Sequence, residues 1–392
     1  MKHSSERRKD SVNWRLNHDM SALSAVDIFA GAGGLTVGLK RAGFNVVAAV
    51  ELEPNAFATY KANHPEVHGF RQDVRSVSGE FLRSFSLDGS VALLAGCPPC
   101  QGFSSLTSKY RKAGKKDPRN SLVGEMARMV KEILPEAVMM ENVPGLAQKG
   151  KRLFNKLLKT LRENGYIVEW DILQVADYGI PQNRRRLVLT AGHGFRIPLP
   201  EPTHSRDGSG MKKPWKTTRS VIFGLQTPVT LAEAMKKGGP RKFSWHVIRN
   251  ISKQNKRRLQ KARPGKSWTK IPKRLRPKCH GNRDVGFSNV YGRMSWNQLP
   301  PTMTGGCTTP SKGRFGHPNG ARTISVREAA LIQTFPPNYI FDTAFMDHAC
   351  NMVGNALPCD FAEIIAKACA EALTNRTKLS TNVPVAKQRK RC

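Results

Sequence analysis

Short apolar runs alternate with segments of helical spacing over the first half of the chain. The runs are rich in alanine and β-branched residues, which is typical of buried strands. Between them, Leu35–Ala42 and Leu153–Leu161 carry apolar residues at helical spacing, and a glycine follows each segment closely. This alternation predicts an α/β fold with a mostly parallel sheet covered on both faces. The predicted strands are Ala25–Phe29, Val46–Val50, Val91–Ala95, Ala137–Met140 and Arg186–Thr190.

The pattern changes after Pro198, where periodicity weakens and basic residues dominate. Residues 206–278 contain 22 Lys or Arg against two acids, Asp207 and Glu233. Only Leu231–Lys236 and Ser252–Lys261 keep a helical spacing there. This composition indicates a second, smaller domain with a basic face.

Two further helices are expected towards the carboxyl terminus. Ser325 and Glu328 form a capping box, which predicts a helix over Ser325–Thr334. The apolar segment Cys359–Leu373 predicts a last helix that packs back on the sheet. We therefore expect a basic extension over 1–24, a main domain over 25–200, a smaller domain over 201–344, a returning helical segment over 345–374 and a basic, disordered tail over 375–392.

The chain of 392 residues has a formal net charge of +35. Such a field attracts polyanions, so nucleic acid is the first candidate partner and an anionic membrane surface the second. There is no apolar run of roughly eighteen residues that would predict a membrane span, and Met1–Met20 lacks the apolar core of a signal peptide. We expect a cytoplasmic protein whose eight cysteines are free thiols.

A rigidly held thiol is predicted in Cys97–Gln101, which reads CPPCQ and follows the third predicted strand. The two prolines end the strand and stiffen the backbone, because each fixes φ and lacks an N–H. A thiol at the mouth of a strand is well placed to act as a nucleophile. The same residues are also consistent with a buried core thiol, half of a zinc site or a redox pair.

A glycine-rich turn, Asp27–Gly34, lies between the first predicted strand and the next helix. Glycines there let the backbone approach a ligand and enter the helix tightly. Glu51 ends the next strand, where an acid is the usual acceptor for ribose hydroxyls, and Asp73 is a candidate acceptor for an adenine amino group. No triphosphate cradle is present, so an adenosine-type ligand fits better than ATP. The alternative is an ordinary strand–turn–helix unit whose glycines serve packing.

Three more polar blocks accompany the Pro-Pro-Cys segment, and one of them, Gly354-Asn355-Ala356, precedes the last predicted helix. Glu141-Asn142-Val143 follows the fourth predicted strand and places a carboxyl at the same sheet edge as Cys100. Gln182-x-Arg184-x-Arg186 can present alternate side chains on one face. In this order the chain resembles the cytosine-5 DNA methyltransferases, and the matching blocks are Asp27-x-Phe29-x-Gly31-x-Gly33-Gly34, Pro99-Cys100-Gln101, Glu141-Asn142-Val143, Gln182-x-Arg184-x-Arg186, Arg293–Thr304 and Gly354-Asn355-Ala356.

The resemblance covers about Val26 to Ile365, except the basic region. It implies a Rossmann-like catalytic domain that binds S-adenosyl-L-methionine, and it implies that the smaller domain is a target-recognition domain with double-stranded DNA in the cleft between the two. The cofactor residues that it implies are Phe29, Gly31, Gly33, Gly34, Glu51, Leu52, Asp73, Pro99 and Asn355.

The resemblance also implies the chemistry. Attack of a thiolate, expected to be Cys100, on carbon 6 of cytosine makes carbon 5 nucleophilic. Glu141 is expected at the N3 edge of the base, where a proton stabilises the developing charge, and Arg184 and Arg186 beside base and phosphate. The cytosine must leave the duplex to be reached, and the basic segment Ser104–Asn120 resembles a mobile loop that closes over it.

The expected DNA contacts are Ser104, Arg119, Gln182 and Arg293, and base reading is expected from a few of Arg241, Arg249, Arg257, Arg258, Arg274 and Arg276. Two positions depart from the family pattern, because Leu52 replaces a common aromatic residue and Cys97 a common glycine or apolar residue. We interpret Cys97 as a packing residue. We expect no metal, since Cys279, His280 and Cys307 are too dispersed to complete a ligand set.

The favoured function is therefore a DNA (cytosine-5-)-methyltransferase, expected to be a monomer that protects host DNA from a cognate restriction endonuclease. An RNA (tRNA) cytosine-5 methyltransferase is one alternative, and a catalytically silent DNA-binding regulator is another. The long basic insertion favours duplex DNA over RNA. The presence of Cys100, Glu141 and Asn355 argues against a silent regulator.

Overall fold

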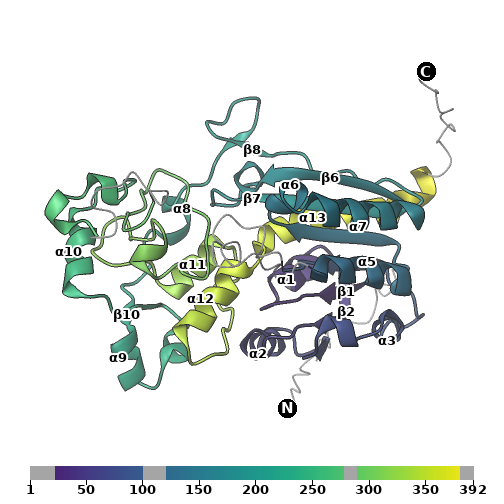
Figure 1. Cartoon of the computed structure of the whole chain (residues 1–392), viewed down its shortest axis with the longest axis horizontal. Helices are drawn as coiled ribbons and strands as arrows, with labels where there is room; N and C mark the ends of the chain where they lie inside the picture. Colours follow the sequence, from purple (N-terminus) through teal and green to yellow (C-terminus); the bar gives the residue numbers. More distant parts are fainter. Residues whose placement is uncertain (1–22, 100–120, 278–288, 380–392) are drawn as a thin grey trace, which may run out of the picture.

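A seven-stranded sheet forms the centre of the larger part of the molecule (Figure 1). The computed structural model describes residues 23–99, 121–277 and 289–379. The strand order is β3-β2-β1-β4-β5-β7-β6, and β7 alone runs in the direction opposite to the other six strands. The expected α/β fold is thus confirmed. The strands are β1 (Ser24–Ile28), β2 (Asn45–Val50), β3 (His68–Phe70), β4 (Leu93–Gly96), β5 (Ala137–Asn142), β6 (Tyr166–Gln174) and β7 (Arg185–His193).

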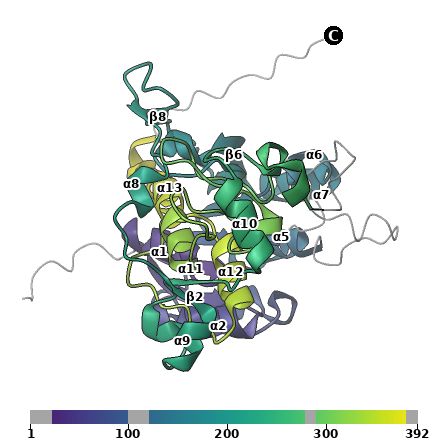
Figure 2. The ribbon, with the colours of Figure 1, turned by 90° about the vertical axis from the view of Figure 1, so that its left-hand side faces the viewer.

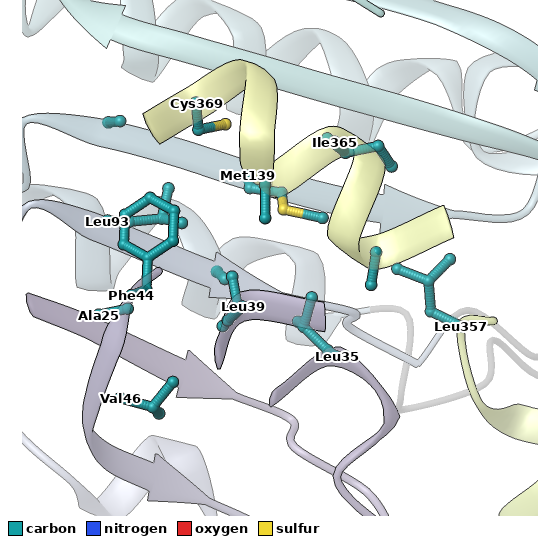
Figure 3. Close-up of a cluster of buried hydrophobic side chains, with 14 of the residues drawn as sticks. Ala25, Leu35, Leu39, Phe44, Val46, Leu93, Met139, Leu357, Ile365 and Cys369 are labelled. Carbon is teal, nitrogen blue, oxygen red and sulfur yellow. The ribbon is translucent and has the colours of Figure 1, made fainter. Parts of the chain in front are cut away.

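Helices cover both faces of the sheet, and Figure 2 shows the two groups on opposite sides. Helices α1 and α13 pack on one face, where Figure 3 shows Leu39 of α1, Met139 of β5 and Ile365 of α13 in one apolar cluster. Helices α3, α5 and α7 cover the other face with a second cluster. The helices of this part are α1 (Gly34–Arg41), α2 (Pro54–Asn63), α3 (Gly79–Arg83), α5 (Leu122–Ile133), α6 (Gly145–Gln148), α7 (Lys151–Glu163) and α13 (Cys359–Leu379).

The second part of the molecule is built from short helices and two-stranded pairings. Its main apolar cluster joins Trp245, Phe315 and Ile332 to Ala32 and Val37 of the larger part, so the two parts share a core. The predicted division at residues 344 and 345 stays a prediction. The elements are β8 (His204–Ser205), β9 (Lys213–Pro214), α8 (Arg219–Ile222), β10 (Val229–Thr230), α9 (Leu231–Lys236), β11 (Val247–Ile248), α10 (Lys253–Lys261), α11 (Val326–Ile332) and α12 (Met346–Asn355).

The predicted capping box at the start of α11 is confirmed. The Ser325 hydroxyl accepts from the Glu328 N–H at 3.0 Å, and the Glu328 carboxylate accepts from the Ser325 N–H at 2.6 Å. Glu328 has no exposed surface and is also paired with Arg322 at 2.8 Å. This buried charge is therefore fully compensated, which makes the start of α11 a fixed point of the second part.

The last helix returns to the sheet as predicted and lies directly against α1. A Cβ atom on Gly38 would lie 2.5 Å from the Ala362 Cβ and from the Glu363 backbone nitrogen. At the helix ends, Arg41 is paired with Asp360 at 2.9 Å. Glycine at position 38 thus sets the distance between α1 and α13.

Two strands at the sheet edges escaped the sequence prediction. Strand β3 is only three residues long, and β6 carries Glu169 and Asp171 among its apolar residues. Edge strands face solvent, so they do not show the continuous apolar runs of the central strands. Helices α2 and α5 were also not predicted.

Replacing Gly38 with alanine should destabilise the protein. The added methyl group overlaps backbone and side-chain atoms of α13, and overpacking of this kind costs about 1 to 3 kcal/mol of unfolding free energy. Thermal unfolding followed by circular dichroism measures the effect. The control is Gly124→Ala in α5, where no described atom beyond its chain neighbours and the backbone of its own helix lies within 4 Å of the Cβ position and helix propensity adds up to about 1 kcal/mol. Equal shifts for both variants would contradict the close contact.

Candidate active site

The glycine-rich turn between β1 and α1 combines open space with tight packing. Gly31 has a φ of +56°, and nothing among the described residues lies within 4 Å of the place a Cβ would take. At Gly33, with a φ of +89°, a Cβ would lie 2.6 Å from His64 Nε2 and from the Tyr339 hydroxyl. Gly34 is similarly confined by a backbone carbonyl. The turn therefore offers Gly31 to a ligand, whereas Gly33 and Gly34 fit it against the protein.

Acidic residues follow the two neighbouring strands. Glu51, after β2, accepts from the Gly31 N–H at 2.8 Å, so this carboxylate and the turn are directly joined. Burial raises the pKa of Glu51, and the adjacent Leu52 is 58 % exposed. Asp73 precedes the short helix η1 (Val74–Ser76) and is paired with Arg75 at 2.5 Å. The hydrogen bond from Arg75 lowers the pKa of Asp73, which therefore remains an anion near neutral pH.

This arrangement fits an adenosine-type ligand. A carboxylate retains free lone pairs after one backbone hydrogen bond to each oxygen, so Glu51 can still accept from ribose hydroxyls. The open space at Gly31 admits the chain attached to the ribose, and Leu52 offers an apolar surface for a base. Over the residues that the structure describes, no group of three or more His, Cys, Asp or Glu side chains could hold a metal ion. In the same residues no helix is long and apolar enough to cross a membrane.

Asp27 is a fully buried carboxyl near the end of β1. Its Oδ2 accepts from the Thr36 hydroxyl at 2.7 Å, and that hydroxyl lies 3.0 Å from the Tyr60 hydroxyl. Its Oδ1 has no hydrogen-bond partner among the described residues. Burial raises the pKa of Asp27 to about 7, so this carboxyl titrates near neutral pH.

Glu141 lies near the carboxyl end of β5 and is 7 % exposed. Its Oε1 is 2.5 Å from Nε of Arg186 on the neighbouring strand β7. The next residue, Asn142, donates from Nδ2 to the Pro98 carbonyl oxygen at 2.9 Å. Pro98 precedes Cys100 by two residues, so Asn142 anchors the chain that leads to the predicted nucleophile at the strand end that carries Glu141.

Cys97 packs against the apolar cluster shared by α1 and α13. Burial, and next the Glu141 carboxylate, raise the pKa of its thiol well above the ordinary value. A thiol that stays protonated at neutral pH is a poor nucleophile. These contacts support the interpretation of Cys97 as a packing residue.

Arg184 is a buried guanidinium that joins chain segments far apart in the sequence. It donates from Nη2 to the Ala356 carbonyl oxygen at 3.0 Å, and from Nη1 to those of Met303 at 3.1 Å and Gly354 at 3.5 Å. Burial lowers its pKa well below the ordinary value. Because Gly354 and Ala356 flank the exposed Asn355, Arg184 fixes the backbone on both sides of that residue.

Two buried glutamines surround Arg184. Gln182 accepts from the Met303 N–H at 2.9 Å and donates to Gln333 Oε1 at 2.6 Å. Gln333, directly after α11, donates to the carbonyl oxygens of Val353 at 2.6 Å and Ala356 at 2.8 Å. Neither glutamine has exposed surface. The buried hub, as we call this group, consists of Gln182, Arg184 and Gln333.

The sequence prediction missed Gln333. A single buried glutamine has neither a periodicity nor a motif of its own, and its partners are backbone carbonyl groups. The one available signal is its place between Ile332 and Phe335, both buried apolar residues, at the end of a predicted helix. A polar residue in such surroundings needs partners inside the protein.

The surroundings of two predicted DNA contacts favour a structural role. Gln182 is fully buried and its amide bonds within the hub. Arg293 is half-buried, and its guanidinium donates to the carbonyl oxygens of Ala262, His317 and Pro318. Both side chains hold segments of the protein together, and their contacts with DNA stay predictions.

Some of the other predicted residues lie outside the part of the chain that the structure describes, and others meet near the glycine-rich turn. Cys100, Ser104 and Arg119 lie outside the described residues. The chain around Asn355 meets the glycine-rich turn, because a Cβ on Gly34 would lie 3.4 Å from the Ala356 Cβ. The structure thus brings together, at the carboxyl edge of the sheet, the turn with Phe29 and Gly31, the acid Glu51 with Leu52, and the segment that carries Asn355.

Comparison with known proteins identifies the family of the chain. Residues 23–371 match the family model of C-5 cytosine-specific DNA methylases. The Type II methylase M.HgiDII of Herpetosiphon aurantiacus is 35% identical over 349 residues, which cover 88% of this chain and 94% of that protein. The Type II methyltransferase M1.HphI of Haemophilus parahaemolyticus is 30% identical over 356 residues, with coverages of 90% and 88%.

Solved structures share the fold. A candidate DNA modification methyltransferase encoded within an E. coli prophage has a TM-score of 0.67 at 23% identity, with 90% of this chain and 99% of that chain covered. The Dnmt2 methyltransferase of S. pombe has a TM-score of 0.58 at 17% identity, with the same coverages. The fold is that of class I methyltransferases. The chain belongs to the family of C-5 cytosine-specific DNA methylases, because the family model spans nearly all of it. Its enzyme class is accordingly DNA (cytosine-5-)-methyltransferase.

Replacing Asp27 with asparagine should change stability in a pH-dependent way. The stability of the variant minus that of the native chain should be larger at pH 8 than at pH 5. The pKa of Asp27 in the folded chain is about 7, which exceeds the ordinary 3.8. The stability of the native chain therefore falls as the pH rises from 3.8 to about 7, and it stays low at higher pH. Asparagine keeps an acceptor for Thr36 and carries no charge. Urea midpoints of both proteins from pH 5 to 8 measure the difference. A stability difference that is the same at every pH would contradict a buried, titrating Asp27.

Replacing Gln333 with methionine should raise the KM for the methyl donor by roughly tenfold, about 1.4 kcal/mol, and leave the KM for DNA nearly unchanged. The variant removes the Gln333 donor from the Val353 carbonyl group and one of the two donors from the Ala356 carbonyl group, which loosens the backbone around Asn355. Initial rates with each substrate varied measure the split. The control is Tyr166→Phe, which removes a buried hydrogen bond to the Pro135 carbonyl at a distant strand. If Tyr166→Phe raises the KM for the methyl donor as much as Gln333→Met does, the hub contributes only to stability.

Proposed function

We propose that this protein transfers a methyl group from S-adenosylmethionine to carbon 5 of a flipped-out cytosine in a specific duplex DNA sequence, through a covalent bond between Cys100 and carbon 6. The observation that carries the proposal is the buried Glu141, 2.5 Å from Arg186, with Asn142 anchoring the chain two residues before Cys100. These side chains lie at one strand end beside the adenosine-type site.

Carbon 5 of cytosine is a weak nucleophile, and the proposed residues change that. The Cys100 thiolate adds to carbon 6, the electron pair of the 5,6 double bond shifts to form a 4,5 double bond, and the carbon 4–N3 pair moves to N3, so that carbon 5 becomes the nucleophilic carbon of an enamine. A proton held between the Glu141 carboxyl and N3 of the base neutralises the charge that develops there. Bound S-adenosylmethionine supplies an electrophilic methyl group on a sulfonium centre. Loss of the carbon 5 proton to a base, followed by departure of the Cys100 thiolate, restores the aromatic ring.

Arg184 and Arg186 divide the work that the sequence assigned to both. Arg186 contacts Glu141 and orients its carboxylate. Arg184 uses its guanidinium on backbone carbonyl groups, so it is a positioning residue rather than a catalytic one. Two buried cations near one carboxylate leave a net positive charge, which favours a thiolate at Cys100.

The cofactor would be held by the residues around the glycine-rich turn. Glu51 would accept from the ribose hydroxyls, Leu52 would pack on the adenine, and Asp73 would accept from its amino group. Gly31 leaves room for the methionine end, and Gly33 and Gly34 keep the turn in place. Phe29, Pro99 and Asn355 complete the proposed wall.

The biological role that we propose is protection of host DNA from a cognate restriction endonuclease. Two relatives carry the name of Type II methylase or methyltransferase and are similar over most of both chains. We propose that the protein acts as a cytoplasmic monomer, with catalytic residues in 25–200 and 345–374 and target recognition in 201–344. Bisulfite sequencing of DNA from an expressing host tests the cytosine methylation on which this role depends and reports the methylated sequence. Methyl transfer from labelled donor only to transfer RNA would favour an RNA substrate.

Replacing Cys100 with serine should abolish covalent trapping on DNA that contains 5-fluorocytosine. Fluorine at carbon 5 blocks the elimination, so the native enzyme remains attached through the thiol. The variant should still bind DNA, because the substitution only exchanges one sulfur atom for an oxygen atom. Denaturing gels with labelled duplex measure the adduct. The matched control is Cys97→Ser, which should still form the adduct, and an adduct with Cys100→Ser would rule out the assigned nucleophile.

A further inference from the structure

The arginines that the sequence offered as base readers are not equally available. Arg241 is paired with Asp342, and Arg249 is paired with Asp347 at the start of α12. Each charge is thus compensated by an acid of the same chain. These two arginines connect the second part of the molecule to the segment that leads back to the sheet, so they are poor candidates for contacts with DNA.

Two more of these arginines build a small apolar core. Arg258 of α10 donates to the Leu275 carbonyl oxygen at 2.7 Å, and its guanidinium lies 5.0 Å from the centre of the Tyr291 ring. Arg276 donates to the Ile271 carbonyl oxygen at 3.0 Å. The residues of this core are Ala262, Trp268, Ile271 and Val290. Arg258 and Arg276 therefore hold residues 252–277 together as a unit, which we call the α10 module.

The remaining cations of the α10 module are all on its surface. The segment contains eleven Lys or Arg and no Asp or Glu. Apart from Arg258 and Arg276, every one of them is exposed, and none makes a side-chain hydrogen bond or ion pair with the described part of the chain. These exposed cations are Lys253, Lys256, Arg257, Lys261, Arg263, Lys266, Lys270, Lys273 and Arg274.

The module lies at one end of the molecule. Helix α10 is at the left end in Figure 1, and the sheet with its helices lies on the opposite side. Figure 2, seen from that end, shows α10 towards the viewer. Its base is fixed, because Gly265 N–H donates to the Arg293 carbonyl oxygen at 2.9 Å and the Arg293 guanidinium donates to Ala262. A rigid unit thus presents uncompensated charge away from the catalytic sheet.

We propose that the α10 module binds the phosphate backbone of duplex DNA without reading its sequence. Six of its nine exposed cations are lysines, whose compact charge suits phosphate better than base edges. Arg257 and Arg274 lie next to the two residues that are joined by the hydrogen bond from Arg258 to the Leu275 carbonyl oxygen, so we assign both to the same stretch of DNA backbone. The inference rests on the proposed DNA substrate. It assigns to the α10 module the part of the affinity for DNA that does not depend on the target sequence.

The test uses two variants of the full chain, Lys256→Gln/Arg257→Gln/Lys261→Gln and Lys270→Gln/Lys273→Gln/Arg274→Gln. Binding constants are measured at several salt concentrations on two duplexes, with and without the sequence that bisulfite sequencing finds methylated. The slope of log K against log salt should fall by about 1 for each side chain that contacts phosphate. The loss of affinity should be the same fold on both duplexes.

The matched control is Lys151→Gln/Arg152→Gln/Lys156→Gln on α7, which removes the same charge at the other end of the molecule. It should leave the salt slope close to native. Loss confined to the methylated sequence would show base reading and overturn the proposal, as would unchanged slopes or equal effects of the control. If the native protein methylates DNA and both variants bind DNA as tightly as the native protein, only the proposed role of the α10 module is refuted. Native protein without methyl transfer refutes the proposed function instead.

Discussion

Backbone carbonyl groups at the junction of α12 and α13 impose the constraint on which the rest of the site depends. The carbonyl oxygens of Val353, Gly354 and Ala356 are held by Arg184 and Gln333 in the protein interior. An unpartnered buried carbonyl costs about 1 to 3 kcal/mol, so this junction forms only when strand β7, helix α11 and the Met303 segment are all in place. The hub therefore couples the closing helices, the second part of the molecule and the sheet. It sets the backbone of Asn355 against the glycine-rich turn and leaves Arg186, two residues along, to meet Glu141.

The choice of arginine at position 184 follows from this geometry. A guanidinium has five N–H donors in a planar fork and can serve several carbonyl groups at once, which an ammonium on a flexible chain does less well. Burial lowers the pKa of Arg184. The carbonyl oxygens of Met303 and Ala356 accept hydrogen bonds from its guanidinium group. Gln182 and Gln333 are neutral, so the hub gains direction and specificity without burying further charge. The same reasoning separates Arg184 from Arg186, whose guanidinium meets a carboxylate.

Most of the catalytic sheet could be predicted because its central strands are buried on both faces and its turns carry glycine and proline. The strand ends of β4 and β5 and the helix start at Ser325 are local features, written in neighbouring residues. The edge strand β6 was not predicted, since its exposed side chains interrupt the apolar pattern. Gln333 was missed for a different reason, because its partners lie on chain segments brought near it only by the fold. Gln182 and Arg293 were placed on DNA because sequence shows charge and polarity but does not show that three carbonyl groups already surround the Arg293 guanidinium.

The arginines of this very basic chain thus do two kinds of work, and burial distinguishes them. Arg184, Arg258, Arg276 and Arg293 donate to backbone carbonyl groups and replace the hydrogen bonds that helices and sheets supply elsewhere. This matters most in the second part of the molecule, where strands are only two residues long and regular ladders are scarce. Net charge alone therefore overstates the surface available to a polyanion. The charge that remains free is concentrated where no acid lies nearby, and a surface of that kind attracts DNA through long-range forces that salt weakens.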